Sequence, residues 1–301
     1  MKNHDEQHTD ERLTIFLQQR QRLLGLAYRM LGTRQDAEDV VQDAYLRFRS
    51  ADLGEVRTPA AWLYTIVTRL CIDVLRRLKT EREQYIGPWL PEPWLGADEA
   101  IPSAQDAAEL ASDLSVGFLL MLDNLTPHER AAFLLREVFE RDYSELAQVL
   151  GRSEVACRQL VHRAKEHLRK PATARPADDA ETRRLLDAFL AAIKAGDEQA
   201  LLATLAPSAT LIGDGGGVVK AAAKPIHGGH LIARFLLGVT AAVVDRITGE
   251  PVQVNGRPGL ALRLDGALAS VLSVDVVDGR IAALYNVLNP HKLEGAKAVL
   301  N

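Results

Sequence analysis

The sequence has 301 residues, of which 47% are hydrophobic and 25% are charged, and its formal net charge is −4. This composition is ordinary for a soluble globular protein and allows two or three domains. The two cysteines, Cys71 and Cys157, lie in separate segments, which excludes a disulfide framework and a paired-cysteine metal site. The most apolar run, residues 231–244, contains Arg234 and is too short to cross a bilayer, so we expect a cytoplasmic protein without membrane contact.

Residues 1–80 are expected to form one all-α domain. Residues 1–12 have the polar composition of a frayed arm, and helices are expected from residue 13 and again from Asp36. The second helix carries four carboxylates in its first two turns and no basic residue among them: Asp36, Glu38, Asp39 and Asp43. The helix dipole favours acids at this end, which is one explanation. The cluster would also suit docking of a positively charged partner protein.

A basic helix is expected next. It begins with Thr58 and Pro59, a hydroxyl cap followed by a residue without a backbone N–H. Apolar residues recur at helical spacing, so one side is buried, and the segment from Arg57 to Lys79 has a net charge of +4. One adjoining face gathers Trp62, Arg69, Asp73 and Arg76. A large aromatic ring beside arginines suits phosphates and unstacked bases, although a solvated amphipathic helix is an alternative.

Residues 81–112 interrupt the helical pattern and carry a net charge of −6. The stretch from Ile86 to Trp94 contains three prolines and two tryptophans in nine residues. Proline cannot continue a helix and favours extended chain, which is typical of a linker. Because exposed indoles leave a large apolar area in water, we expect Trp89 and Trp94 to dock on another surface.

Residues 113–170 are expected to form a second all-α domain with a helix-turn-helix. A Thr126-Pro127 start predicts a helix through Glu140, and residues 141–170 follow as two helices around a turn closed by Gly151. The last helix, from residue 152 to 170, has a net charge of +4. Such a helix enters the major groove, where Arg pairs with guanine and Gln with adenine. A solvated basic helix is the alternative.

After a short linker at residues 171–178, residues 179–301 are expected to form an α+β domain. Helices are predicted at 179–195, 198–205 and 228–237, followed by apolar runs at 242–254, 260–264, 268–277 and 281–288. Asn-Gly and Asp-Gly pairs separate the runs and predict hairpins. The helices are therefore expected to pack in a curved antiparallel sheet, which makes the whole chain a multidomain protein.

One group in this last domain could carry chemistry. Asp214, His227 and His230 could serve as an acid–base set or hold a metal. Their spacing matches no dedicated motif, and Asp214 with the three glycines after it is typical of a tight turn that another surface can approach closely. We therefore expect no catalytic residue, no cofactor and no metal.

The motifs together resemble those of the extracytoplasmic-function (ECF) sigma factors, which are promoter-recognising subunits of bacterial RNA polymerase. The resemblance rests on Asp36-Ala-Glu-Asp-Val-Val-Gln-Asp-Ala, Thr58-Pro-Ala-Ala-Trp-Leu-Tyr, and Leu125-Thr-Pro-x-Glu-Arg ahead of Tyr143-Ser-Glu-Leu-Ala. It implies that the acidic helix binds the polymerase clamp through Asp36, Glu38, Asp39, Gln42 and Asp43. The −10 element would be bound and melted by Arg57, Trp62, Arg69, Asp73, Arg76 and Arg77. The duplex −35 element would be bound by Ser153, Arg158, Gln159, His162, Arg163 and Lys165.

Three further segments resemble the ECF subgroup with a fused SnoaL-like C-terminal domain: Trp89-Leu-Pro-Glu-Pro, Asp214-Gly-Gly-Gly and Asn289-Pro-His-Lys-Leu. This resemblance implies that the C-terminal domain regulates the sigma domains in cis and that the linker passes through polymerase near the RNA path. The implied regulatory interface comprises Trp89, Pro91, Glu92, Pro93, Asp214, Gly215, Gly216, Gly217, Asn289, Pro290, Lys292 and Leu293. The sequence departs from the subgroup's Asp-Gly-Gly-Gly-Lys pattern, because Val218 and Val219 intervene before Lys220.

The sequence thus predicts a promoter-specificity subunit that is not itself an enzyme. Its expected partners are core RNA polymerase, the −35 duplex and melted −10 strand of promoter DNA, and its own C-terminal domain, which could also bind a small molecule. One alternative is a ligand-responsive helix-turn-helix regulator that binds duplex DNA through residues 141–170 alone. Another is a protein whose C-terminal domain is a small-molecule enzyme.

Overall fold

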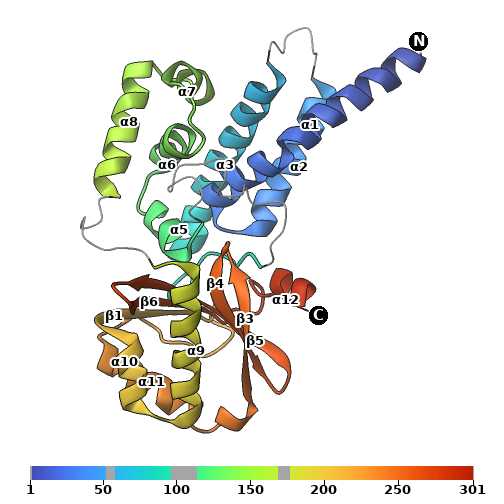
Figure 1. Ribbon diagram of the computed structural model, residues 1–301. Helices are drawn as coiled ribbons and strands as arrows, with labels where there is room; N and C mark the ends of the chain where they lie inside the picture. The colour runs from blue at the N-terminus through green and yellow to red at the C-terminus, as the bar shows by residue number, and fades with distance from the viewer. Residues whose placement is uncertain (1, 52–57, 96–113, 169–176, 301) are drawn as a thin grey trace. The chain divides into compact units, whose positions relative to one another are not determined.

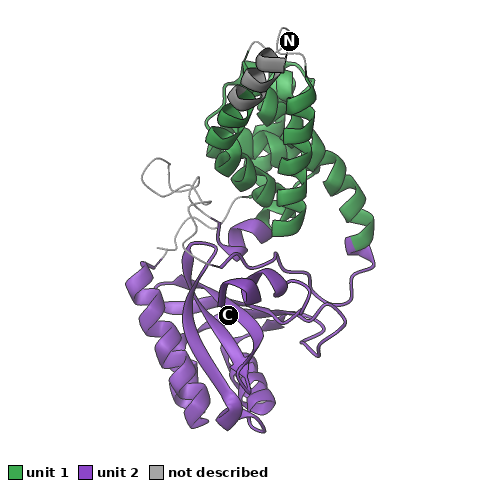
Figure 2. Ribbon diagram, turned by 90° about the vertical axis from the view of Figure 1, so that its right-hand side faces the viewer, with its two compact units in different colours: residues 1–81, 98–113, 121–169 green, residues 82–97, 114–120, 170–301 purple. Residues whose placement is uncertain are grey.

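The computed structural model describes residues 2–51, 58–95, 114–168 and 177–300, with side chains from residue 12 onward. The described residues form two compact units, shown in separate colours in Figure 2. The first contains the two helical regions, up to residue 81 and from 121 to 168. The second contains the C-terminal domain with residues 82–95 and 114–120. No helix within the described ranges combines the length and apolar character needed to span a bilayer.

The first helical region of unit 1 consists of α1 (Lys2–Leu31), α2 (Arg34–Ser50) and α3 (Pro59–Glu83). Helix α1 begins at Lys2, so the frayed arm expected for residues 1–12 is wrong: from Lys2 onward those residues extend the first helix. Thr33 caps α2 by accepting a hydrogen bond from the Asp36 backbone N–H. The buried side chains come from all three helices, for example Leu23, Phe48 and Leu63.

Helix α5 (Val116–Leu122) belongs mostly to unit 2. The second helical region of unit 1 then continues through α6 (Pro127–Phe133), α7 (Tyr143–Leu150) and α8 (Glu154–His167). Thr126 and Glu129 form a capping box at the start of α6. The helix expected to continue through Glu140 instead widens into a π-helical segment, η1 (Leu134–Val138). Gly151 ends α7 with a φ of 62°, and Ser153 caps α8, as a helix-turn-helix requires.

Unit 2 is built on a six-stranded sheet with the order β2-β1-β6-β5-β4-β3. Its strands are β1 (Leu205–Asp214), β2 (Ile226–His227), β3 (Ile247–Val254), β4 (Arg257–Leu264), β5 (Ala267–Val277) and β6 (Arg280–Val287). Its helices are α9 (Asp179–Ala195), α10 (Glu198–Thr204), α11 (Gly229–Thr240), the short η2 (Val244–Arg246) and α12 (Glu294–Leu300). The described pairings are antiparallel except that β1 and β6 are parallel, so the expected antiparallel sheet holds with this one exception.

The two faces of the sheet pack against different parts of the chain. Helices α9, α10 and α11 cover one face (Figure 1), with a core that includes Phe189, Ile232 and Leu284. The other face packs against the linker and the C-terminal segment, through Leu90 and Leu293 among others. Successive side chains along a strand point to opposite faces. Adjacent residues of β1 and β6 therefore belong to different cores.

Candidate functional site

The Asp214 carboxylate holds the linker against the C-terminal domain. Asp214 ends β1 and is fully buried. It accepts hydrogen bonds from the linker at the Tyr85 hydroxyl (2.6 Å) and the Leu90 backbone N–H (2.8 Å), and from its own loop at the Gly216 N–H (3.0 Å). Lys292 forms an ion pair with the same carboxylate at 2.7 Å. Four donors around one carboxylate satisfy a charge that would otherwise be costly to bury.

Lys292 joins the same cluster from the C-terminal side. Its Nζ atom donates to the Leu90 carbonyl oxygen at 2.5 Å and lies over the rings of Trp89 (4.2 Å) and Tyr85 (4.9 Å). Burial lowers the pKa of Lys292 to about 8, against the opposing effect of Asp214, which favours the ammonium form. Burial and the hydrogen bond to Asp214 raise the pKa of Tyr85. At neutral pH the cluster therefore contains an ammonium group at Lys292 and a neutral phenol at Tyr85.

Asn289 and the glycines after Asp214 complete this cluster. The Asn289 Nδ2 atom donates to the Tyr85 hydroxyl at 2.8 Å, and the side chain lies directly against Gly216. A Cβ atom on Gly216 would stand 2.2 Å from Asn289 Nδ2, and Gly216 has a φ of 62°. A Cβ atom on Gly215 would stand 2.1 Å from the Val219 carbonyl oxygen. These two positions therefore need glycine for close approach and, at Gly216, for backbone conformation.

A second set of contacts fixes the other end of the linker. Trp94 is buried, and its backbone exchanges hydrogen bonds of 2.8 Å with Asn255: Trp94 N–H donates to Asn255 Oδ1, and Asn255 N–H donates to the Trp94 carbonyl oxygen. Asn255 Nδ2 also donates to the Leu114 carbonyl oxygen at 2.8 Å. Leu95 forms an isolated bridge with Val254, so the linker adds a short extended segment at the end of β3.

The structure places the predicted interface residues as follows. Pro91, Glu92 and Pro93 are buried, and Trp89 is half-buried. Leu293 is buried in the core shared with the linker, Pro290 is half-buried, and Gly217 packs near Ile86. The sequence prediction did not include Tyr85 or Asn255. Tyr85 comes just before the proline-rich stretch, and Asn255 matched a hairpin turn, so neither carried a signal for linker contact.

The residues considered for catalysis are not brought together. His227 is on β2 opposite Thr210, and its Nδ1 atom lies 3.1 Å from the Thr210 hydroxyl. Asp214 is four residues further along β1, roughly 13 Å at the usual rise of a strand. His230 is exposed at the start of α11. No group of three or more metal-binding side chains occurs among the described residues.

In unit 1 the acidic helix α2 presents part of its carboxylate cluster to solvent. Asp39, Gln42 and Asp43 are exposed. Asp36 accepts a hydrogen bond from the Thr33 hydroxyl at the start of the helix, and Glu38 forms an ion pair with Arg34 at 2.8 Å. Three of the five predicted polymerase-binding side chains therefore lie on the open surface, and two interact with their own helix or its cap.

The residues predicted for the −10 element are not all equally accessible. Arg57 lies outside the described residues. Trp62 is half-buried, with its ring 5.7 Å from that of Phe48. Arg69 donates hydrogen bonds to the carbonyl oxygens of Val149 (3.1 Å) and Gln148 (3.2 Å), in the last turn of α7. Arg69 is nevertheless exposed, as are Asp73, which pairs with Arg76 at 3.2 Å, and Arg77, which lies 3.8 Å from Glu81.

All six residues predicted for the −35 element are exposed on α8 or at its cap. Arg158 pairs with Glu154 at 2.8 Å and lies over the Tyr143 ring. Arg163 pairs with the buried carboxylate of Glu129 at 3.0 Å, and Lys165 with Glu137 at 2.7 Å. Burial opposes ionisation of Glu129, but its bonds to Thr126 and Arg163 outweigh this and lower its pKa. Ser153 acts as the helix cap, accepting from the Ala156 N–H at 3.2 Å, and Gln159 and His162 complete the exposed set.

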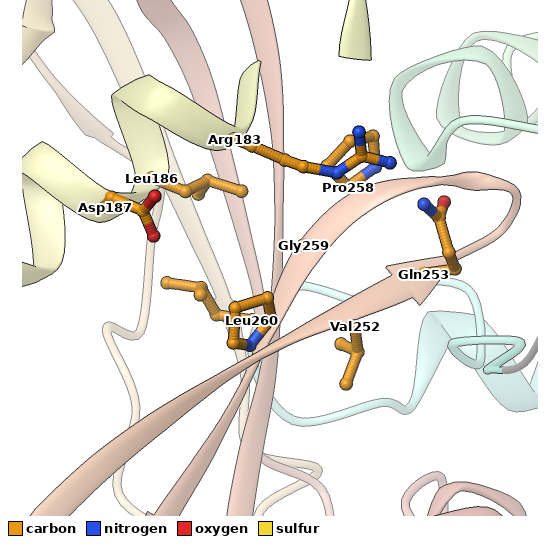
Figure 3. A pocket seen from close by; sticks show the side chains of 9 residues that line it. Arg183, Leu186, Asp187, Val252, Gln253, Pro258, Gly259 and Leu260 are labelled. Carbon is orange, nitrogen blue, oxygen red and sulfur yellow. The ribbon is translucent and has the colours of Figure 1, made fainter. Parts of the chain in front are cut away.

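A small hollow of about 180 Å³ lies between α9 and the β3–β4 hairpin. Arg183 extends from α9 toward Pro258 across this hollow, while Leu186 and Leu260 line its floor (Figure 3). Arg183 also lies 3.6 Å from Asp179 on its own helix. None of the residues predicted for polymerase, DNA or regulatory contacts lines it.

Comparisons with known proteins show the family to which the chain belongs. Two family models match, Sigma-70 region 2 over residues 15–81 and Sigma-70 region 4 over residues 116–168. The ECF RNA polymerase sigma factor SigJ of Mycobacterium tuberculosis is 37% identical over 292 residues, covering 92% of this chain and 91% of that protein. The probable ECF RNA polymerase sigma factor SigI of the same species is 30% identical over 280 residues, covering 92% and 93%.

The crystal structure of Mycobacterium tuberculosis SigJ matches with a TM-score of 0.73 at 33% identity, covering 94% of this chain and 98% of that one. The match includes the C-terminal α+β domain as well as the two helical regions, since it covers nearly the whole chain. In sequence, domain order and fold, the chain belongs to the extracytoplasmic-function RNA polymerase sigma factors of the SigJ type.

Proposed function

We propose that this chain directs core RNA polymerase to specific promoters and that its C-terminal domain controls this activity by holding the linker. The observation that carries the proposal is the buried cluster in which Asp214 and Lys292 bind the linker at Tyr85 and Leu90. The members of a buried polar cluster must all be satisfied, so a cluster built from three distant segments fixes how those segments pack together.

The linker is the element through which control acts. Its backbone is bound at both ends, at Leu90 by Asp214 and Lys292 and at Trp94 by Asn255. A linker held in this way is withheld from any path through polymerase. Release requires opening of the Asp214 cluster, so the stability of the cluster sets the fraction of molecules with a free linker.

The sigma regions supply the remaining contacts. The exposed Asp39, Gln42 and Asp43 provide a surface for the polymerase clamp. Gln159 and His162 on α8 face solvent and are suited to base edges of the −35 duplex. Arg69 reaches a melted −10 strand only after its guanidinium group leaves the α7 carbonyl oxygens of Gln148 and Val149.

Run-off transcription by core polymerase with the full chain tests the proposal. We expect promoter-dependent RNA, and we expect Asp214→Asn to change its amount while binding to core polymerase is retained. Asp278→Asn is the matched control, because Asp278 is an exposed turn residue of the same domain. Duplex binding without promoter-dependent RNA would favour a conventional helix-turn-helix regulator. Equal transcription by Asp214→Asn and wild type would refute control through the linker.

A further inference from the structure

The face of the sheet opposite the linker encloses a cavity in the C-terminal domain. Its volume is about 300 Å³, within the lower range of small-molecule sites. It lies between the sheet and the helices α9 and α11, and the loop after β1 borders it at residues 220–222. Most of the lining is apolar, with representative side chains Phe189 and Ile193 from α9, Phe235 and Leu236 from α11, and Leu211 and Leu284 from the sheet.

Several of the apolar side chains that line the cavity keep surface that is accessible to solvent. Leu190 and Ile193 of α9, Phe235 of α11 and Leu262 of β4 are half-buried, and Val239 near the end of α11 is 54% exposed. Apolar surface in contact with water favours any apolar group that covers it, because the hydrophobic effect is roughly proportional to the area removed from water. The cavity therefore suits the apolar part of a ligand.

The charges of the lining favour an anionic head group on such a ligand. Within the part of the chain that the structure describes, two cationic residues line the cavity, Arg263 and Lys220, and no Asp or Glu does. The guanidinium group of Arg263 pairs with Glu250 at 3.1 Å and donates to the carbonyl oxygens of Gly266 (3.1 Å) and Leu300 (3.0 Å), so its charge is already balanced. The side chain of Lys220 is exposed and forms no ion pair or hydrogen bond with the described residues. Lys220 is therefore the cation of the lining that remains available to a ligand.

The sequence around Lys220 has the same sign of charge. Residues 215–244, which include the loop and α11, contain Lys220, Lys224 and Arg234 and no Asp or Glu. A lysine stem packs along apolar surface while its ammonium group stays in water, so Lys220 adds a positive charge at the solvent-exposed edge of the cavity. We propose that this cavity binds a small amphiphilic anion, an aliphatic or aromatic carboxylate, whose apolar body fills the cavity and whose carboxylate pairs with the Lys220 ammonium group.

A matched pair of probes tests the charge preference in the full chain. 2-Naphthoate and 2-naphthamide have the same ring system and nearly the same shape, but only naphthoate is charged at neutral pH. In a fluorescence titration at low salt we expect wild type to bind 2-naphthoate roughly threefold more tightly, as a solvent-exposed ion pair implies. Lys220→Met keeps the apolar stem without the charge and should abolish this preference. Lys224→Met is the matched control and should keep it, because Lys224 is exposed on the same loop and does not line the cavity.

Three results would overturn the proposal. Equal affinities of wild type for the two probes would show that the cavity does not select an anion. A preference that survives Lys220→Met would place the carboxylate elsewhere. An equal loss of the preference in both lysine variants would assign it to the overall charge of the loop rather than to a pair with Lys220.

A second pair of variants locates the binding site. Ala269 lines the cavity from β5, and Ala267 is exposed two residues earlier on the same strand and does not line it. We expect Ala269→Phe to weaken 2-naphthoate binding roughly tenfold or more by filling space, and Ala267→Phe to leave it unchanged. Melting temperatures identify a variant that fails to fold, and Lys220→Met, which changes an exposed side chain, should melt like wild type and keeps the proposal testable in that case. Unchanged binding by a folded Ala269→Phe would place the probe elsewhere and refute the site.

Discussion

Asp214→Asn provides the most direct test of how strongly the linker is held. The substitution keeps the shape of the side chain but removes the charge that pairs with Lys292 at 2.7 Å. Asp214 is fully buried and Lys292 is 9% exposed, so the variant leaves a buried ammonium group without its counterion. Removing one partner of a buried pair costs about 3 kcal/mol or more. A loss of about 3 kcal/mol corresponds to a roughly 150-fold increase in the population with a released linker.

Amide hydrogen exchange measures this population directly. The Leu90 N–H donates to Asp214 Oδ2, so it exchanges only when the linker leaves the domain or the whole domain unfolds. We expect peptides containing Leu90 to exchange roughly 100-fold faster in Asp214→Asn, and Asp278→Asn to exchange like wild type. The double variant Asp214→Leu with Lys292→Met removes both charges and should recover much of the protection.

A change of less than about fivefold at Leu90 would refute the reasoning, because it would mean a contribution below 1 kcal/mol from the ion pair. Slow exchange at Leu90 together with faster exchange throughout β1 and β6 would also contradict it. That pattern would show that the carboxylate stabilises the domain rather than the docked linker.

Further predictions concern Lys292, Arg69 and three side chains of α8. The pKa of Lys292 is about 8 in the folded protein and 10.5 in the unfolded chain, so between these pH values the unfolded state binds more protons. The free energy of unfolding should therefore rise from pH 8 to about pH 10. Above pH 10 the raised pKa of Tyr85 acts in the opposite direction. Urea titrations at several pH values check this, and Lys292→Met should remove the rise. Arg69→Ala loses both hydrogen bonds to the α7 carbonyl oxygens, so we expect urea unfolding to show a stability of unit 1 about 1 kcal/mol lower. We also expect permanganate footprinting to show weaker promoter melting by this variant. Promoter melting equal to that of the wild type would contradict the −10 assignment. Gln159→Ala and His162→Ala should alter the −35 sequence preference in gel-shift assays without changing the free energy of unfolding. Arg163→Ala should instead destabilise the domain by about 1–3 kcal/mol, because it leaves the buried Glu129 carboxylate without its ion pair.

Local signals in the sequence were enough for most of the helices and for the family. The Thr126 capping box, Gly151 and Ser153 set the ends of the helix-turn-helix as predicted, and the helix at 179–195 has the predicted bounds. The resemblance to ECF sigma factors with a fused C-terminal domain is confirmed by the relatives that match over nearly the whole chain. The roles of individual residues in polymerase and DNA binding stay predictions.

Elements that depend on distant contacts could not be predicted in the same way. Strand β1 contains Pro207 and has a register shift between Leu205 and Thr210, so it shows no clean alternation, and its parallel partner β6 is about 75 residues away. The attachment of Arg69 to the end of α7 joins residues 80 apart. The same holds for Tyr85, whose hydroxyl meets Asp214 and Asn289 across more than a hundred residues. The spacing of apolar and charged residues within one segment carries no information about contacts between residues that are so far apart in the sequence.

The alternation along β1 and β6 has a mechanical consequence. At the end of β1, Gly213 lines a cavity of about 300 Å³ on the helix-covered face of the sheet, while Asp214 binds the linker at Leu90. Just after β6, Leu288 lines the same cavity, while Asn289 donates a hydrogen bond to Tyr85 of the linker. A single peptide unit separates each pair, and protein interiors are too tightly packed to absorb a displacement without passing it on. A displacement on the helix-covered face of the sheet would therefore be passed on to the residues that bind the linker.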